Sequence, residues 1–351
     1  MKILAAVRHP GPAEAVVPVI KKLRSQGHQV TLLGLNNNSI ETKTLGGSVS
    51  IFNRNNIEHF DMVDMDANFD LTEVDSKWTN SVIEKYKPDR ILVGCSTQEE
   101  LITCIENAFI LAGSNYSIPT LQLVEMWGCW TSRPSMFYPD RFAILDLFTK
   151  NVLLERGAPQ ERIKITGNPS FDDYYYSNLN QFSISPGESL GSRKFIYVGQ
   201  VTSDNFTTLD WTIKSLGEND FLAFAKHPRD SRNYDELLKQ AGDRLITTNL
   251  GSNDLLKRVD VCLTHTSTMG VKAALLGRPT INFIVDNNQD EVNQICGGFP
   301  LVLAEGSYKA DSLETLRGLL KKDLIVNQSK LCSILNIDGM SAARVVDYLL
   351  G

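Results

Sequence analysis

The chain has 351 residues, of which 42% are hydrophobic and 22% are charged, and its formal net charge is -6. This length exceeds what one hydrophobic core usually serves, so two domains are expected, and the acidic balance argues against a general nucleic-acid-binding protein. The six cysteines lack CxxC spacing, which is typical of buried thiols in a reducing compartment. We find neither a signal-peptide pattern nor an apolar run of membrane-spanning length, and therefore expect a cytoplasmic protein.

In the first half, short apolar runs alternate with segments of helical periodicity. Residues 2–7 predict a buried strand, 14–25 a helix and 29–35 a second strand, which together make a βαβ unit. The alternation continues with strands at 90–94, 117–123 and 141–148 and with helices at 99–113 and 150–157. Strands that alternate with helices predict a parallel sheet covered by helices on both faces.

The stretch from 170 to 192 interrupts this alternation with three consecutive tyrosines and then Asn, Gln, Ser, Pro and Gly, as a linker would. The pattern resumes with strands at 194–199, 221–225, 244–248, 259–263 and 280–284. The expected domains are an N-terminal domain over 1–170, a linker over 171–192, a second α/β domain over 193–338 and a closing helix over 339–351 that returns to the first domain.

Small hydroxyl residues and a glycine gather where one strand of the second half ends. Thr266, Ser267 and Thr268 follow His265, and Gly270 comes just inside the next predicted helix. Free N–H groups and the positive end of a helix dipole favour an oxyanion such as phosphate, and glycine lets the backbone approach it closely. An ordinary Ser/Thr N-cap explains the same residues without a ligand.

Earlier in the same half, an apolar strand runs directly into Lys226, His227, Pro228 and Arg229. Ligands of open parallel sheets bind outside the carboxyl ends of the strands, so cations at this point suit a phosphate. We expect this strand end to neighbour the Thr266–Gly270 segment, with both in reach of one diphosphate. A solvated loop with scattered charge is the alternative.

Three segments, at 155–169, 259–283 and 338–344, resemble in their order and spacing the GT-B enzymes that use nucleotide sugars. The resemblance is to UDP-N-acetylglucosamine 2-epimerases and to GT-B glycosyltransferases, in which the chain crosses to its second domain after a turn like Gly167-Asn168-Pro169. It implies an α/β fold with two Rossmann-like domains that face each other across a cleft.

The Lys226-His227-Pro228 strand end is also similar to that of CDP-glycerol phosphotransferases and of CMP-sialic acid or CMP-Kdo transferases. In those families the His and later hydroxyls hold the phosphate of the nucleotide, which the resemblance carries over to His227, Ser267 and Thr268. The other expected members of the phosphate site are Lys226, Arg229, His265, Thr266 and Gly270.

Two departures from these families stand out. Lys272 occupies the position at which UDP-sugar enzymes carry a Glu for the ribose hydroxyls, and an ammonium group accepts no hydrogen bonds. Gly94-Cys95-Ser96 stands where the hydrolysing epimerases have Gly-Asp-Thr, so their catalytic Asp is missing. The first departure leaves open an altered nucleotide choice or a loss of activity, and the second argues against an epimerase.

For the catalytic base we favour Glu125, which follows an apolar strand and resembles the Glu of an epimerase motif. Trp127 and Trp130 beside it would stack on a sugar, or would lower the local polarity and raise the pKa of the carboxyl group. A surface-loop Glu with two partly buried tryptophans is the alternative. Asp140 is the second candidate base, and a turn residue otherwise.

The first strand-to-helix loop contains Arg8, His9 and Gly11 and is not a GxGxxG loop. In GT-B proteins this loop faces the cleft, so the resemblance implies contact with the donor phosphate or the acceptor. A plain turn is the alternative.

Together, these patterns predict a metal-independent GT-B transferase that moves a sugar or polyol phosphate from a nucleotide-activated donor to a glycan or lipid-linked acceptor. Glu125 and His227 are the expected catalytic residues, and no metal or other cofactor is expected. The alternatives are a nucleotide-sugar 2-epimerase and a catalytically decayed nucleotide-sugar-binding protein. Nucleic acid is not an expected partner. Peripheral membrane contact, oligomeric state, donor, acceptor and stereochemistry stay open.

Overall fold

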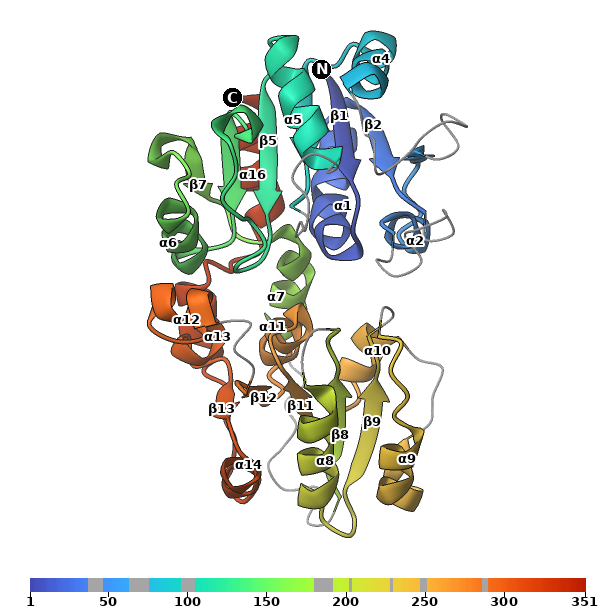
Figure 1. Cartoon of the computed structure of the whole chain (residues 1–351), viewed down its shortest axis with the longest axis vertical. Helices are drawn as coiled ribbons and strands as arrows, with labels where there is room; N and C mark the ends of the chain where they lie inside the picture. The colour runs from blue at the N-terminus through green and yellow to red at the C-terminus, as the bar shows by residue number, and fades with distance from the viewer. Residues whose placement is uncertain are drawn as a thin grey trace. The chain divides into compact units, whose positions relative to one another are not determined.

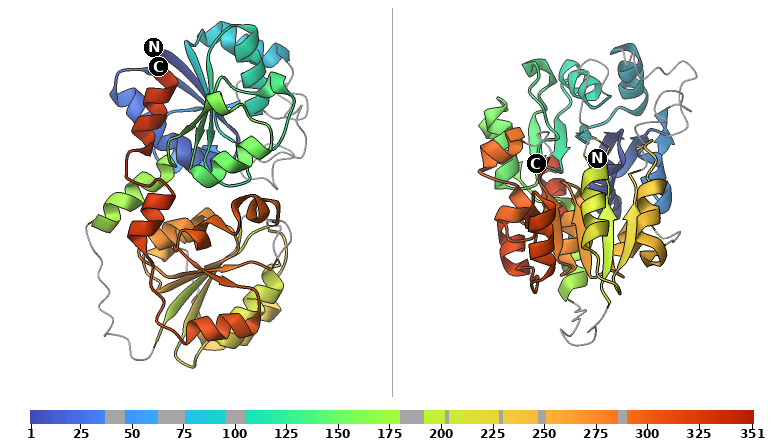
Figure 2. Two further views of the ribbon diagram at one scale, coloured as in Figure 1. Left: turned by 90° about the vertical axis from the view of Figure 1, so that its left-hand side faces the viewer. Right: turned by 60° about the horizontal axis from the view of Figure 1, so that its bottom comes forward.

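The computed structural model describes residues 1–36, 47–62, 76–95, 105–179, 192–201, 204–227, 230–246, 251–285 and 290–351. The chain divides into two compact units: unit 1 is Met1–Asp172 with Leu335–Gly351, and unit 2 is Asp173–Ile334. Each unit is built around one parallel β-sheet with helices on both faces (Figures 1 and 2). The prediction of an α/β protein with two Rossmann-like sheets is confirmed.

The sheet of unit 1 has the strand order β3-β2-β1-β4-β5-β6-β7. Its strands are β1 (Lys2–Val7), β2 (Gln29–Gly34), β3 (Phe60–Asp61), β4 (Arg90–Val93), β5 (Thr120–Val124), β6 (Arg141–Ile144) and β7 (Ile163–Ile165). The last of the strands predicted before the linker, at 141–148, is shorter than expected. Asp146 accepts a hydrogen bond from Thr149 N at 2.7 Å, which starts helix α6 and stops the extended chain.

Alternate residues of β1 pack into two separate hydrophobic cores, which explains why its sequence is apolar throughout. Ile3, Ala5 and Val7 pack in the core under α1 (Pro10–Ser25) and α16 (Ser341–Leu350). Leu4 and Ala6 pack in the core under α4 (Ser76–Tyr86) and α5 (Ile105–Asn115). Because successive side chains of a strand point to opposite faces, a strand covered on both sides reads as a continuous apolar run.

The remaining described helices of unit 1 are α2 (Val49–Arg54), α6 (Leu147–Glu155), η3 (Ser135–Phe137), η4 (Gln160–Arg162) and η5 (Pro169–Phe171). The closing helix α16 lies on α1 and contributes Val345, Val346 and Leu349 to the first core. Its first turn is held by the carboxylate of Asp172, which accepts from Ser341 N at 3.1 Å and Ala342 N at 2.8 Å.

The sheet of unit 2 has the order β10-β9-β8-β11-β12-β13. Its strands are β8 (Lys194–Val198), β9 (Phe221–Ala225), β10 (Leu245–Ile246), β11 (Val261–Thr264), β12 (Thr280–Phe283) and β13 (Tyr308–Ala310). The helices are α7 (Asp172–Leu179), α8 (Asn205–Ser215), α9 (Asp235–Leu238), η6 (Lys239–Arg244), α10 (Ser252–Leu256), α11 (Thr268–Leu275), α12 (Asp290–Cys296), α13 (Pro300–Leu303), α14 (Leu313–Leu320) and α15 (Gln328–Ile334). The expected linker thus begins as helix α7, and its residues 180–191 lie outside the described ranges.

In both sheets the chain reverses the direction in which it adds strands. In unit 1 the chain adds β2 and then β3 on one side of β1, and it then places β4 on the other side of β1. Unit 2 does the same, from β8 through β9 and β10 and then with β11. The loops diverge at such a reversal and leave a crevice outside the carboxyl ends of the two central strands.

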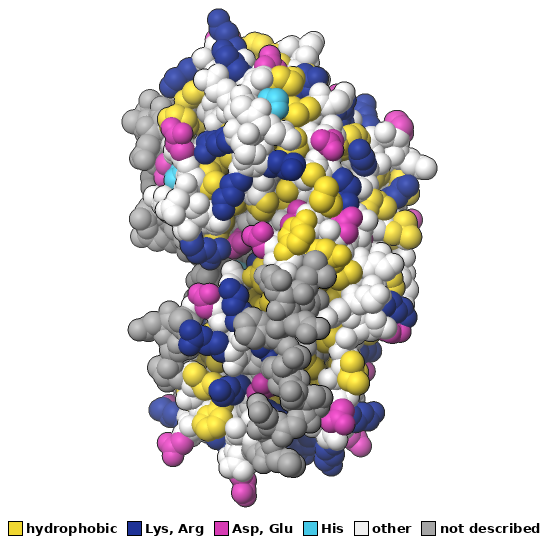
Figure 3. Space-filling view, turned by 180° about the vertical axis from the view of Figure 1, so that it is seen from behind, with side chains coloured by type: hydrophobic (Ala, Val, Ile, Leu, Met, Phe, Trp, Pro, Cys, Tyr) yellow, Lys and Arg dark blue, Asp and Glu magenta, His cyan; other side chains and the backbone are white. Residues whose placement is uncertain are grey.

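Charge is mixed on the surface. On the face drawn in Figure 3, outside the grey atoms, basic and acidic side chains alternate over both units and form no large basic patch. In the portion of the chain that is described, no helix combines the length and hydropathy needed to cross a membrane.

A substitution at Gly113 on α5 tests how closely this helix packs against the sheet of unit 1. A Cβ there would lie 2.3 Å from Thr120 Cγ2 and 3.0 Å from the Ile118 carbonyl oxygen. Gly113→Ala should therefore destabilise unit 1 by about 1–3 kcal/mol through overpacking, although alanine is the better helix former. The free energy of unfolding is measured by urea titration with tryptophan fluorescence.

The matched control is Gly318→Ala on the exposed side of α14, where no atom of the described residues lies within 4 Å of the added Cβ. It should stabilise unit 2 by about 0.5–1 kcal/mol, because alanine loses less backbone entropy than glycine. Equal effects of the two substitutions would contradict the packing argument.

Candidate functional site

The reversal point of unit 2 brings together the loops that follow β8 and β11. Gln200 lies just beyond β8, and Thr266 lies just beyond β11. The side-chain oxygen Oε1 of Gln200 accepts hydrogen bonds from Thr266 N at 2.7 Å and from Thr266 Oγ1 at 3.1 Å. One oxygen atom thus receives two donors of the loop that leads into helix α11.

The hydroxyl cluster forms the start of α11. Ser267 is the N-cap and accepts a hydrogen bond from Met269 N at 3.2 Å, so the N-cap interpretation describes this side chain. Gly270 permits the close approach of helix and sheet, because a Cβ would lie 3.2 Å from Thr264 Cγ2 and 3.3 Å from Thr280 Cγ2. The predicted phosphate contacts of this segment remain predictions.

His265 lies beneath the loop. Its side chain is 2% exposed, and its Nε2 lies 3.0 Å from Thr208 Oγ1 and 3.3 Å from the Tyr197 hydroxyl. The ring also packs against Phe283, and the His265 carbonyl accepts a hydrogen bond from Asn282 Nδ2. We predicted a phosphate contact for this residue, and that contact remains a prediction; the contacts named here are those of a buried support for the loop.

The cationic segment after β9 is only partly described, since Pro228 and Arg229 lie outside the described residues. Lys226 turns back along the chain: its Nζ donates to the Arg232 carbonyl at 2.6 Å and lies 5.8 Å from the Tyr234 ring centroid. His227 is half-buried, and its carbonyl accepts from Asp230 N at 2.9 Å.

The expectation that this strand end neighbours the end of β11 is wrong. Strand β8 lies between β9 and β11 in the sheet. The two strand ends are therefore two strand spacings apart, roughly 10 Å. The loop after β8, with Gln200, fills the position between them.

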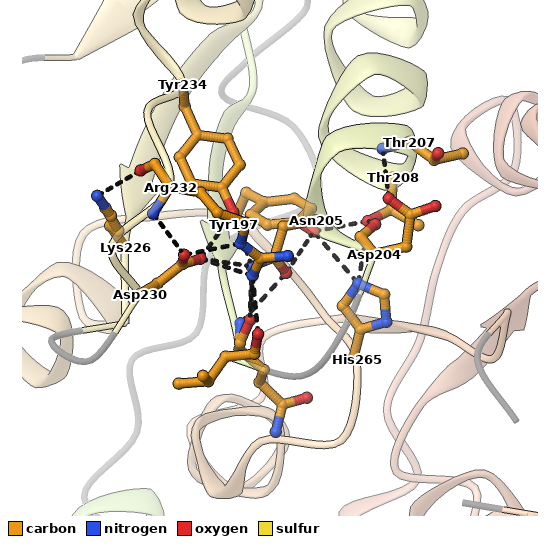
Figure 4. A network of polar contacts seen from close by, with 12 residues as sticks. Tyr197, Asp204, Asn205, Thr207, Thr208, Lys226, Asp230, Arg232, Tyr234 and His265 are labelled. Carbon is orange, nitrogen blue, oxygen red and sulfur yellow. Dashed lines mark hydrogen bonds and ion pairs between the residues drawn. The ribbon is translucent and has the colours of Figure 1, made fainter. Parts of the chain in front are cut away.

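A buried polar network joins the loops after β8 and β9 (Figure 4). Asp230, whose side chain is 2% exposed, accepts from Arg232 Nε and Nη2 at 2.7 Å each and from the Tyr234 hydroxyl at 2.6 Å. Arg232 Nη2 also donates to the carbonyls of Gln200 and Val201 at 3.0 Å each. Burial alone would raise the pKa of Asp230, but the hydrogen bonds from Arg232 and Tyr234 outweigh it and hold the pKa well below the usual range.

Sequence reasoning missed this network and the role of Gln200. The contacts of Arg232 with Val201 and of Gln200 with Thr266 span 31 and 66 positions along the chain, so no local pattern displays how the loops are joined. The available signal was the position of Gln200 directly after a predicted strand, which is where ligands of parallel sheets bind.

Lys272 is a buried cation on α11, with 4% of its surface exposed. Its Nζ lies 3.5 Å from Asn253 Oδ1 and 5.5 Å from the ring centroid of Tyr174. Tyr174 in turn donates its hydroxyl hydrogen to Asn253 Oδ1 at 3.2 Å. The position that holds a ribose-binding Glu in UDP-sugar enzymes therefore carries a donor that packs toward α7 and α10.

In unit 1, Glu125 lies at the carboxyl end of β5 and is 5% exposed. Its Oε1 lies 3.7 Å from where a Cβ of Gly11 would stand, which is ordinary van der Waals distance, so the carboxyl group lies beside the start of α1. Among the described residues, Oε2 has no hydrogen-bond partner. Burial raises the pKa of Glu125 well above its ordinary value, and the nearby Cys129 and Glu106 raise it further.

The loop after β1 lies at the same edge of the sheet. Arg8 N donates to Glu106 Oε1 at 3.2 Å, and Arg8 and His9 are both half-buried. Gly11 is exposed. The structure thus brings the predicted loop residues close to Glu125 through Gly11, and their contact with a ligand remains a prediction.

Both tryptophans near Glu125 belong to the core of unit 1. Trp127 is 6% exposed and donates its Nε1–H to Asp146 Oδ2 at 2.8 Å. Trp130 is fully buried and packs edge-on against Phe142, with ring centroids 5.6 Å apart. The burial of both rings argues against stacking on a sugar. It supports the other predicted role, in which the rings make the surroundings of Glu125 less polar.

Asp140 lies at the opposite edge of the sheet. Its Oδ2 accepts from Thr120 N at 2.8 Å, at the amino end of β5, and it directly precedes β6. The structure supports its interpretation as a turn residue and argues against a role as a base beside Glu125.

Over the described ranges, no three His, Cys, Asp or Glu side chains are grouped so that they could hold a metal ion. Each unit thus has its own candidate site at the carboxyl-terminal edge of its sheet. The edge in unit 2 offers amide and hydroxyl donors, and the edge in unit 1 offers a buried carboxyl group with one oxygen that lacks a described partner.

No protein-family model matches the sequence, and no curated protein sequence does. Solved structures do match over the full chain. UDP-GlcNAc 2-epimerase from Methanocaldococcus jannaschii matches with a TM-score of 0.67 at 16% identity, over 100% of this chain and 99% of that one. The Neisseria meningitidis UDP-GlcNAc 2-epimerase, bound to UDP-GlcNAc, matches with 0.66 at 18% identity over 100% of both chains.

MurG from Acinetobacter baumannii matches with a TM-score of 0.62 at 11% identity, over 99% of both chains. All three are proteins of the GT-B fold. This chain therefore has that fold, as the sequence segments predicted. Identities of this size establish the shared architecture and leave the activity to be argued from the site.

Glu125→Gln tests the electrostatic state of the buried carboxyl group. Because its pKa is raised in the folded protein, the folded state holds a proton that the unfolded state releases as the pH rises past the ordinary Glu value. Glu125 therefore costs stability as the pH rises, and it costs nothing at a pH below both pKa values. Glutamine does not titrate in this range. The free energy of unfolding of the variant, relative to that of the wild type, should therefore increase as the pH rises from 4 to 8.

The measurement is urea unfolding of both proteins across that range. Asp146, whose pKa burial raises to about 6, is common to both proteins and cancels in the difference. The exposed Glu218→Gln serves as a control for the chemistry of the substitution. A difference between Glu125→Gln and wild type that does not grow with pH would contradict the buried, proton-holding carboxyl group.

Proposed function

We propose that this chain is a nucleotide-sugar enzyme, and that it is a metal-independent transferase. It would move a sugar or polyol phosphate from a nucleotide-activated donor to a glycan or lipid-linked acceptor. The observation that carries the proposal is the reversal point of unit 2, where Gln200 Oε1 and the Thr266 N–H and hydroxyl meet directly before the start of α11.

The donor phosphates bind at this reversal point. Backbone N–H groups, hydroxyls and the positive end of a helix stabilise oxyanions, and their geometry is fixed before the ligand arrives. Lys226 and His227 follow β9, which lies on the other side of β8 from β11, and in our proposal they supply positive charge to the leaving phosphate. Arg229, which lies outside the described residues, has the same proposed role. Stabilisation of this kind requires no metal ion.

Glu125 acts as the general base in this proposal. It accepts the proton of the acceptor hydroxyl, whose oxygen bonds to the transferred group as the bond to the leaving phosphate breaks. Burial raises the pKa of Glu125, so its carboxylate form is a stronger base than an exposed carboxylate, and it is this deprotonated form that accepts the proton. The proposal assigns the base to unit 1 and the phosphate site to unit 2.

A nucleotide-sugar 2-epimerase is the second candidate, favoured by the full-length likeness to two such enzymes. Against it, Cys95 stands after Gly94 where the hydrolysing epimerases carry an Asp. Incubation with UDP-GlcNAc alone separates the two candidates. An epimerase converts or hydrolyses it without an acceptor, and a transferase releases free nucleotide in proportion to the acceptor supplied.

His227→Ala should abolish nucleotide-induced stabilisation while it leaves the fold intact. A panel of UDP, CDP, CMP and GDP compounds is compared by thermal unfolding. A ligand at a hundredfold excess over its Kd should raise the Tm of the wild type by roughly 5–10 °C. His28→Ala in unit 1, near the N-terminus, is the control and should keep the full shift. An undiminished shift in His227→Ala would remove this residue from the donor site.

Glu125→Gln should keep nucleotide binding and lose turnover by about 10² to 10⁴, which is the usual contribution of a general base. Release of nucleotide in the presence of acceptor is the readout, with the thermal shift as the test of donor binding. The exposed Glu161→Gln on η4 is the matched control. Unchanged turnover in Glu125→Gln would eliminate it as the base.

A further inference from the structure

The coordination of Gln200 Oε1 is that of a bound oxyanion. Two donors of one residue, the N–H and the hydroxyl of Thr266, converge on this single oxygen at 2.7 and 3.1 Å. Thr266 lies two residues before the first helical residue of α11, where N–H groups and the helix dipole favour negative charge. The amide oxygen, which carries a partial negative charge, thus lies where the proposed function places a phosphate oxygen.

The backbone of Gln200 is anchored independently of its side chain. Its N–H donates to Asn205 Oδ1 at 3.2 Å, and its carbonyl accepts from Asn205 Nδ2 at 2.6 Å and from Arg232 Nη2 at 3.0 Å. The side chain is half-buried, and its Oε1 accepts hydrogen bonds from Thr266. Rotation of the side chain would therefore release Thr266 without disturbing the loop that carries Gln200.

We propose that the Gln200 side chain is an internal substitute for a phosphate oxygen of the donor, and that it sets which ligands enter the site. This inference rests on the proposed function. A ligand binds only if it displaces the amide oxygen from Thr266, so the cost of that displacement is subtracted from its affinity.

The consequence is a minimum affinity that a ligand must exceed. Hydrogen bonds to an ionised acceptor are shorter and roughly twice as strong as those to a neutral one. A phosphate oxygen therefore replaces the amide oxygen at a net gain, and a sugar or polyol hydroxyl does not. The displacement cost lowers the affinity of every ligand equally, so Gln200 leaves the ratio of affinities unchanged. A diphosphate still binds at a net gain, whereas a weakly held free sugar or polyol stays unbound.

If Gln200 had a purely structural role, its substitution would change the affinity for phosphate in the opposite direction. If its side chain served to hold the Thr266 loop in a binding-competent shape, every substitution would weaken phosphate binding. If it competes with the ligand, removal of the amide oxygen strengthens binding, and a permanently charged oxygen at the same place weakens it. The two roles are therefore distinguishable by direction.

The experiment is calorimetric titration of the full chain with pyrophosphate, UDP and CDP. Gln200→Ala should bind the diphosphates about fivefold more tightly, the equivalent of one neutral hydrogen bond that no longer has to be broken. Gln200→Met keeps the length of the side chain without its amide and should act in the same direction. Gln200→Glu should weaken binding at least tenfold, because its carboxylate holds Thr266 more strongly and repels phosphate.

Gln240→Ala, an exposed glutamine of η6, is the control and should match the wild type. Far-UV circular dichroism and Tm check that each variant is folded. If the wild type binds a diphosphate and both Gln200→Ala and Gln200→Met bind it equally or more weakly, the substitution idea is wrong and the donor site stands. If neither the wild type nor any Gln200 variant binds pyrophosphate or a nucleotide, the proposed donor site is wrong and the role of Gln200 falls with it.

Discussion

The ion pair of Asp230 and Arg232 is the contact on which the geometry of the unit 2 site depends. Arg232 bonds the Asp230 carboxylate through two nitrogens, and one of them also holds the carbonyls of Gln200 and Val201. The loop after β9 and the loop after β8 are thereby fixed to each other. Gln200 extends the connection to Thr266, so the ends of three strands share one hydrogen-bonded system.

A buried carboxylate is tolerated there because each of its acceptor sites is filled. Tyr234 and Asn205 complete the bonds to Asp230, which keeps the charged form stable despite burial. Removal of one partner of such a pair would leave a buried, uncompensated charge, which is why this kind of pair is costly to break. The network is therefore rigid support for the loops, and the residues that face a ligand are those it positions.

Glu125 in unit 1 shows the opposite environment. Its carboxyl group is buried without a cation among the physical causes of its raised pKa, and one of its oxygens has no described hydrogen-bond partner. Folding thus places a group in a state that destabilises the protein at neutral pH. Proteins accept such a cost at functional sites, and this contrast with Asp230 is the reason why we propose a chemical role for Glu125 and a structural one for Asp230.

Most of the fold was predictable because it follows from local patterns. The apolar run of β1 and the helical spacing of α1 are decided by residues close in sequence, and the order of strand and helix then restricts the sheet to few topologies. The site was predictable only in part. The position of β8 between β9 and β11, and the contacts of Gln200 with Thr266 and Arg232, depend on pairings across 30 or more residues that no period reveals.

The sequence itself could have narrowed two other assignments. Asp140 directly precedes a predicted strand, so it had to lie at the amino edge, away from the end of β5 that carries Glu125. His265 was treated as a ligand contact because it neighbours Ser267, although the first residue beyond a buried strand often still points into the core. Its contacts with Thr208 and Tyr197 are long-range and required the structure.

Lys272 connects the phosphate site to the question of what distinguishes this chain from UDP-sugar enzymes. Its ammonium group is buried near Asn253 and Tyr174, so it accepts nothing from a ribose diol and offers only positive charge and N–H donors. Under the proposed function, Lys272 leaves the ribose without an acceptor at this position, so binding of a nucleotide would rely more heavily on its phosphates and on the loops after β8 and β11. In our proposal the contact between Gln200 and Thr266 lies where those phosphates bind, so it acts on the interaction that would supply most of the affinity.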